Sequence, residues 1–165
     1  MRTATAKKLA LSAILLSALV FAPIAHSHCQ IPCGIYNDQL RFDMMAEHIT
    51  TIEKAMKMIT SLSQTEKPNY NQLVRWVQNK EEHADEISRI VTYYFMAQRI
   101  KPTAKTDDKA YNQYLSKLVL LHEILVYSMK SKQTTDLANV EKLKSLLAEF
   151  RAVYFGEHSH SGHKH

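Results

Sequence analysis

The sequence predicts an all-α protein, an antiparallel four-helix bundle with an N-terminal metal-binding hook. Residues 35–155 contain no glycine and only two prolines, Pro68 and Pro102, so little in their composition interrupts helices. Apolar side chains in this stretch recur at spacings of three and four, the period of an amphipathic helix. Both cysteines of the chain, Cys29 and Cys33, lie just before it.

Residues 1–27 have the features of a secretory signal peptide. A basic start is followed by a nearly continuous apolar run over residues 9–22, and residues 25–27 have the small-x-small pattern that signal peptidase cleaves after. The apolar run is shorter than the roughly 20 residues that span a membrane. We therefore expect an exported protein, periplasmic or extracellular, without a membrane anchor after cleavage. Its mature chain would begin at His28.

The hook is residues 28–36, H-C-Q-I-P-C-G-I-Y, directly behind the expected cleavage site. A mature N-terminus at His28 supplies an amine and an imidazole, Cys29 supplies a backbone amide and a thiolate, and Cys33 supplies a second thiolate. Nickel and copper(II) favour square-planar sets of nitrogen and sulfur donors. Pro32 fixes φ and favours a turn between the two thiolates. The amine and thiols must lose protons to bind, so metal occupancy should fall in acid.

The first helix is expected over about residues 38–62. Asn37 or Asp38 can cap it, because their side-chain oxygens accept hydrogen bonds from the free N–H groups of a first turn. Its apolar stripe consists of Phe42, Met45, Ile49, Ile52, Met56 and Ile59.

The second helix is expected to begin near Pro68, a residue suited to a first turn, and to end near Ile100, before Pro102. Two apolar stripes run along it, so we expect one side to face its own bundle and the other to face a neighbouring subunit. One stripe is Val74, Val77, Ala84, Val91 and Phe95, and the other is Leu73, Trp76, Ile87, Ile90 and Tyr94.

The third helix is expected over about residues 107–131 and the fourth over about residues 135–155. The short polar turns between the four helices favour up-and-down, antiparallel packing. His122 lies on the predicted apolar line of the third helix, where we expect a hydrogen-bonded core residue and not a metal ligand. The two stripes are Tyr111, Leu115, Leu118, Leu125 and Met129, then Val140, Leu143, Leu147, Phe150 and Tyr154.

Residues 37–156 therefore make up the predicted bundle, followed by a His-rich tail over residues 157–165. The tail alternates histidine with Ser, Gly and Lys and cannot form a core, so we expect it to be disordered. It is either a loose collector of nickel, zinc or copper ions or a solvated end without function.

The size and charge of the mature chain limit the function classes. Removing 27 of the 165 residues leaves 138, enough for one domain with a single core. Three of the 21 basic residues belong to the signal, which leaves 18 basic against 16 acidic residues. So small a net positive charge argues against a nucleic-acid-binding protein, which needs a concentrated basic face.

The string H-C-x-x-P-C-G-x-Y at residues 28–36 resembles the hook of the nickel superoxide dismutase family. The resemblance implies a nickel cofactor, one ion per subunit, with His28, Cys29 and Cys33 as ligands and the His28 imidazole axial to the oxidised ion. It also implies a homohexamer in which each hook packs against neighbouring subunits. Tyr36, which ends the motif, is assigned a role in holding water or superoxide over the metal or in gating access to it.

The later chain resembles this family mainly in helix order and in Tyr94-Phe95 followed by Arg99 and Pro102. Tyr94 is a second, weaker candidate for the site.

The axial imidazole needs a partner on its other nitrogen. In the family this is a glutamate early in the first helix, paired with an arginine from the second. Here Asp43 falls at the glutamate's place after a one-residue gap, and His83 falls near the arginine's place. Glu47 is a competing partner. For His48 and His83 we favour an ordinary polar role on the helix surface.

The sequence thus predicts an exported nickel-dependent superoxide dismutase that converts superoxide to dioxygen and hydrogen peroxide by Ni(II)/Ni(III) cycling. Two alternatives stay open. One is a periplasmic nickel or copper carrier that binds metal without redox turnover. The other is a helical adaptor closed by a disulfide between Cys29 and Cys33, which an oxidising compartment would allow.

Overall fold

The computed structural model describes residues 37–158, and the side chains of residues 37–156. The four long helical segments are α2 (Asp38–Ser63), α3 (Tyr70–Arg89), α4 (Asp108–Gln133) and α5 (Ala138–His158). A π-helix, η1 (Ile90–Arg99), continues α3. The predicted signal peptide, the hook and the end of the His-rich tail lie outside the described residues.

Asparagine and aspartate side chains cap the starts of the helices. The Oδ1 atoms of Asn37, Asn69 and Asp107 accept hydrogen bonds from backbone N–H groups three residues later, at 3.4, 3.1 and 3.0 Å. Each bond satisfies one of the donors that a helix start leaves free. Asn37, one of the two residues predicted to cap the first helix, is therefore its cap.

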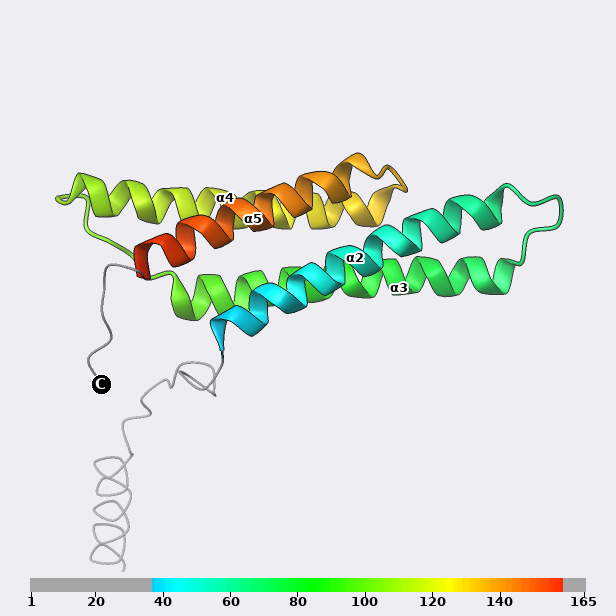
Figure 1. Cartoon of the computed structure of the whole chain (residues 1–165), viewed down its shortest axis with the longest axis horizontal. Helices are drawn as coiled ribbons and strands as arrows, with labels where there is room; N and C mark the ends of the chain where they lie inside the picture. Colours follow the sequence, from blue (N-terminus) through cyan, green and yellow to red (C-terminus); the bar gives the residue numbers. More distant parts are fainter. Residues whose placement is uncertain (1–36, 159–165) are drawn as a thin grey trace, which may run out of the picture. The chain divides into compact units, whose positions relative to one another are not determined.

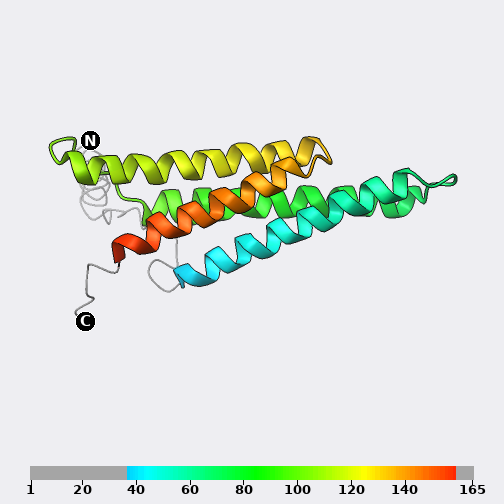
Figure 2. The same ribbon diagram turned by 45° about the horizontal axis from the view of Figure 1, so that its top comes forward.

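The four helical segments pack as a bundle in which neighbours in the sequence are neighbours in space. Figures 1 and 2 show α2 and α3 running antiparallel side by side, and α4 and α5 doing the same. Contacts between α3 and α4, and between α2 and α5, join the two pairs. The predicted four-helix bundle is confirmed. None of the described helices is both long enough and apolar enough to cross a membrane.

The core follows the predicted stripes of the first and fourth helices closely. Five of the six predicted residues of α2 are buried, and so are all five of α5. In α3 and η1 the buried apolar side chains gather toward the C-terminal half. They are Ala84, Ile87, Ile90, Val91, Tyr94 and Phe95.

The N-terminal half of α3 has an apolar row outside the bundle. Tyr70, Val74 and Val77 are 72, 55 and 41% exposed and follow one another at spacings of four and three. The helix begins at Tyr70 after its cap Asn69, so Pro68 precedes the helix and is not in its first turn.

The predicted buried face of α4 is only partly correct, because Leu118 and Leu125 pack against the core whereas Leu115 and Met129 do not. Leu115 and Met129 are 38 and 50% exposed, whereas Leu121, Ile124 and Ser128 are fully buried. The central stretch of this helix has apolar residues on several faces, and the face that packs lies one position away from the predicted line. His122, one residue after Leu121, consequently points outward and is exposed. The expectation that it is a core histidine is therefore wrong.

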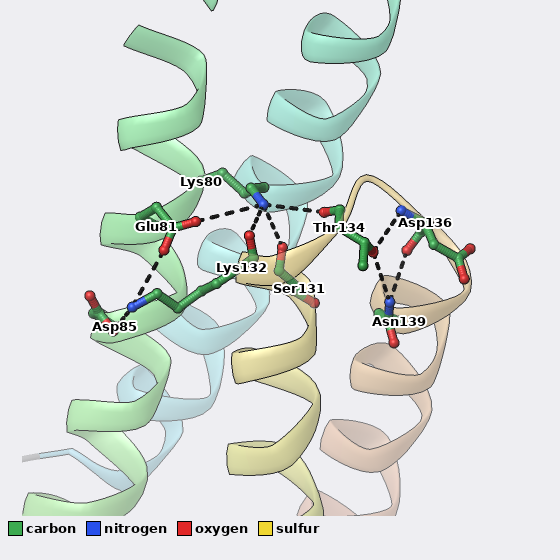
Figure 3. Close-up of polar contacts among 8 residues, drawn as sticks. All are labelled: Lys80, Glu81, Asp85, Ser131, Lys132, Thr134, Asp136 and Asn139. Carbon is green, nitrogen blue, oxygen red and sulfur yellow. Dashed lines mark hydrogen bonds and ion pairs between the residues drawn. The ribbon is translucent and has the colours of Figure 1, made fainter. Parts of the chain in front are cut away.

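A buried lysine closes the end of α4 (Figure 3). Lys80 of α3 is 4% exposed, and its Nζ donates to the carbonyl oxygens of Ser131 at 2.9 Å and Thr134 at 3.2 Å, and to that of Lys132. Burial lowers the pKa of Lys80. The ammonium satisfies carbonyls that the helix end leaves free and complements the negative end of the helix dipole. It thereby fixes α3 to the turn between α4 and α5.

A second ion pair flanks this lysine. Lys132 donates to Asp85 at 2.8 Å and lies 3.5 Å from Glu81, whose other oxygen lies 3.7 Å from the Lys80 Nζ. These pairs are more exposed than Lys80 and contribute correspondingly less.

Replacing Lys80 by methionine should lower the free energy of unfolding by about 1–3 kcal/mol, because three carbonyl oxygens lose their buried donor while the side chain keeps its volume. Urea unfolding of the purified protein measures the loss. Lys57→Met, at an exposed residue of α2, is the matched control and should change stability by less than about 0.5 kcal/mol. Equal losses in the two variants would contradict the capping role.

Candidate functional site

The best-defined polar site in the described residues lies at the start of α2, two residues after the end of the hook. The carboxylate of Asp38, in the first turn of α2, accepts hydrogen bonds from three side chains. The Nε of Arg99 donates to Oδ1 at 2.7 Å, the hydroxyl of Tyr94 also donates to Oδ1, and the hydroxyl of Tyr154 donates to Oδ2 at 2.8 Å. We call these four residues the Asp38 clamp. It joins α2, η1 and α5.

Arg99 holds the carboxylate through two nitrogens. Its Nη2 lies 2.5 Å from Oδ1 of Asp38, and its Nε also donates to the hydroxyl oxygen of Tyr94 at 3.1 Å. The Cζ of Arg99 lies 5.3 Å from the centre of the Tyr94 ring. Side chains held from several directions lose little further freedom on binding a neighbour, so the clamp is a rigid feature of this end of the bundle.

The π-helix accounts for the way in which Tyr94 and Arg99 meet one carboxylate. These residues are five apart in sequence, and a π-helix bonds each residue to the one five positions on, so that residues at this spacing lie close together. The N–H of Ile100 donates to the carbonyl of Phe95 at 2.8 Å with this spacing. In a regular α-helix, neighbours on one face are three or four apart. The irregular helix therefore builds this part of the site.

An aromatic layer supports the clamp from the core. Phe42, Phe95 and Phe150 pack with ring centres 4.9–5.2 Å apart, and all three are fully buried. Tyr154 packs against Phe95 at 5.5 Å, so the ring that donates to Asp38 is itself part of this layer. Ring pairs at such distances are favourable beyond the area they bury.

The clamp holds Asp38 as a carboxylate and both tyrosines as neutral phenols. Burial alone would raise the pKa of Asp38, but the hydrogen bonds from Tyr94, Arg99 and Tyr154 outweigh it and lower the pKa below the usual value. Burial and the neighbouring Asp38 raise the pKa values of Tyr94 and Tyr154. At neutral pH the site is therefore a set of fixed donors around one anion, with no group poised to act as a base.

The predicted partners of the axial imidazole lie elsewhere on α2 and α3. Asp43 is exposed, and its Oδ1 accepts from Gln39 at 2.8 Å and from Arg151 at 3.3 Å. Glu47 is also exposed. His83 meets His48, with 2.8 Å between their Nδ1 atoms. Which of Asp43, Glu47 and His83 pairs with His28 stays a prediction.

Sequence reasoning missed the carboxylate and arginine pair of the clamp. Asp38 was considered only as a helix cap, and Arg99 only as part of a resemblance after Tyr94. The two are 61 residues apart, and no local pattern joins them. The predicted ligands His28, Cys29 and Cys33 and the candidate Tyr36 lie outside the described residues. Between residues 37 and 156, no three His, Cys, Asp or Glu side chains converge as metal ligands would.

Asp38→Asn should lower the free energy of unfolding at pH 7 by about 2 kcal/mol, the size of a hydrogen bond to a charged group. Because the native pKa of Asp38 is lowered, the unfolded chain binds more protons here as the pH falls. The contribution of the carboxylate is complete above its unfolded pKa of about 3.9 and is lost as the pH falls through the lower native value. Urea unfolding at a series of pH values should show the gap between wild type and variant closing below about pH 4.

Asp43→Asn is the control for this substitution. It removes an exposed carboxylate whose ion pair with Arg151 is long, so the loss should stay below about 0.5 kcal/mol at pH 7. If Asp38→Asn and Asp43→Asn have the same effect at every pH, the clamp does not stabilise the bundle.

Comparison with known proteins assigns the chain to a family. The family model of nickel-containing superoxide dismutase matches residues 23–158, which include the hook and the whole described bundle. No match was found among curated proteins or among solved structures. The predictions of a superoxide dismutase and of nickel as its cofactor are confirmed by the family match. The chain therefore belongs to the nickel-containing superoxide dismutases, oxidoreductases that convert superoxide to dioxygen and hydrogen peroxide.

Proposed function

We propose that the mature enzyme begins at His28 and that the hook holds one nickel ion per subunit. The observation that carries this proposal is the donor set of the hook. His28 offers a terminal amine and an imidazole, Cys29 an amide and a thiolate, and Cys33 a second thiolate. The family match includes these positions.

The donors suit nickel at both oxidation levels. The two thiolates and the deprotonated amide are anionic and donate electron density strongly, and square-planar nitrogen and sulfur sets are those that nickel prefers. Nickel, when bound, supplies the Ni(II)/Ni(III) couple that takes an electron from one superoxide ion and gives it to another. The imidazole of His28 is the donor that we assign to the oxidised state.

Tyr36 is the group of the hook that we assign to substrate and protons. Forming hydrogen peroxide consumes two protons, which we assign to water held by the Tyr36 phenol. Tyr36 directly precedes Asn37, the cap of α2, and Asp38, the centre of the clamp. The clamp thus fixes the start of α2, to which the hook is joined. We assign it the role of positioning Tyr36.

We also propose that the enzyme is exported and assembles into a homohexamer. Residues 1–27 provide the export signal. The row of Tyr70, Val74 and Val77 on α3 supports assembly, because large apolar residues at helical spacing outside the bundle are typical of a surface that another chain covers.

The terminal amine gives the sharpest test of the ligand set. A chain that retains Ser27 differs from the proposed mature protein by one residue, which turns the His28 amine into an amide. We expect it to lose superoxide dismutation to the background rate after nickel loading, and Cys29→Ser and Cys33→Ser should do the same. A serine added after His165 is the matched control and should leave the rate unchanged. Full activity of the Ser27-retaining chain would reject the amine ligand.

Assembly is tested by Val74→Lys combined with Val77→Lys. Two charges on the apolar row should reduce the molar mass measured by light scattering from that of the oligomer to that of smaller species, while the helix content measured by circular dichroism stays the same. Ala148→Lys, at an exposed position on α5, is the control. An unchanged mass of the double variant would exclude this row from the subunit interface.

A further inference from the structure

Two histidines from different helices meet on a side of the bundle formed by α2 and α3. The Nδ1 of His48 in α2 lies 2.8 Å from the Nδ1 of His83 in α3, and the ring centres are 5.0 Å apart. Neither ring belongs to the hook, to the Asp38 clamp or to the ion pairs around Lys80. The two helices that carry them are packed along their length, so the contact is held by the core.

The pair lines a hollow of about 590 Å³ on the surface. The hollow contains oxygen donors as well as the two rings, and an acidic residue adjoins His48 directly. Its lining residues are Asp43, Ala46, Glu47, His48, Thr50, Thr51 and His83. Two carboxylates and two imidazoles around one hollow favour a cation over an anion.

The 2.8 Å separation of the two nitrogens is that of a hydrogen bond between the rings, and it is also a separation at which both nitrogens can bind one ion. Two nitrogens each about 2.0 Å from a metal and at a right angle to one another are about 2.8 Å apart, whereas a tetrahedral angle would place them about 3.3 Å apart. Right angles between neighbouring ligands are characteristic of tetragonal copper(II) and nickel(II), and imidazole suits both ions.

The charge state of His48 favours metal binding as well. Burial and the nearby His83 lower the pKa of His48, although Glu86 and Glu47 act in the opposite direction. His48 is therefore neutral at pH 7, the form in which imidazole binds metal.

We propose that His48 and His83 form a second metal site, separate from the hook, that binds copper(II) or nickel(II) through the two Nδ1 atoms. The remaining positions are filled by water, because no third His, Cys, Asp or Glu side chain within residues 37–156 converges on the pair. The bound ion joins α2 to α3. The site needs neither the cysteines nor the free N-terminus, so it persists when the hook cannot bind metal.

The test uses the full mature chain with competing donors removed, that is His28→Ala, Cys29→Ser, Cys33→Ser and asparagine at the four tail histidines. Copper(II) is titrated into this protein, with the affinity measured by competition against a chelator and the bound nitrogens counted by electron paramagnetic resonance. We expect a site with two imidazole nitrogens and a raised Tm in the presence of the ion. His48→Asn and His83→Asn should each weaken that site about tenfold or more and abolish the shift in Tm.

His122→Asn is the matched control, because His122 is an exposed histidine on α4 away from the hollow. It should leave affinity, nitrogen count and Tm shift unchanged. Equal affinity and nitrogen count in His83→Asn and the parent would overturn the proposal and leave the pair as a hydrogen bond alone. Because the parent protein lacks the hook ligands, this result is independent of whether the hook binds nickel.

A second measurement does not depend on the folding of these variants. In the unaltered mature chain, copper(II) should protect His83 from carbethoxylation, followed by peptide mass spectrometry, while His122 stays reactive. Equal labelling of His83 with and without the ion would also overturn the proposal.

Discussion

The Asp38 carboxylate is the interaction on which this end of the molecule depends. A single anion in the first turn of α2 binds an arginine and a tyrosine from η1 and a second tyrosine from α5. The aromatic layer of Phe42, Phe95 and Phe150 lies against the same helices and keeps the donors in place. Removing the anion would leave the cation and two hydroxyl groups without the acceptor around which they are arranged.

The position of the clamp in the sequence gives it a functional meaning. Asp38 lies two residues after the nine residues that carry the proposed nickel ligands, so the hook and the bundle meet at Asn37 and Asp38. A nickel centre built from residues close together in the sequence needs two things from the rest of the protein: a fixed point of attachment and protection from solvent. The clamp provides the point of attachment, and neighbouring subunits would shield the centre from solvent in the proposed hexamer.

Opposite charges secure the two ends of α5. Its start follows the turn whose carbonyls bind the Lys80 ammonium, and its final turns carry Tyr154 to Asp38. In each case a buried or half-buried charge binds several hydrogen-bonding groups from other segments. These contacts set the position of α5 more specifically than the interchangeable apolar contacts of the core can.

Local patterns in the sequence predict much of this fold. Apolar spacing identifies the helices and the buried faces of α2 and α5, and a compact motif identifies the family. Apolar spacing did not fully identify the buried face of α4, because residues around Leu121 are apolar on more than one face and several stripes fit equally well. It could not show that the end of the second helix is a π-helix, because Tyr94 and Phe95 satisfy an α-helical stripe too.

Contacts between distant residues were beyond this kind of reasoning. Asp38 meets Arg99, and His48 meets His83, only because of how α2 packs against α3 and η1. The hook is the opposite case, since its donors are neighbours along the chain and their chemistry can be argued from covalent structure alone. The sequence is therefore most informative about the proposed nickel ligands and least informative about the groups that surround them.

X-ray absorption at the nickel edge of the purified mature protein tests whether the hook holds the nickel ion. We expect two sulfur ligands, from Cys29 and Cys33, with nitrogen in the remaining positions. Coordination by nitrogen and oxygen alone, in a protein that removes superoxide, would contradict the hook as the site of the reaction.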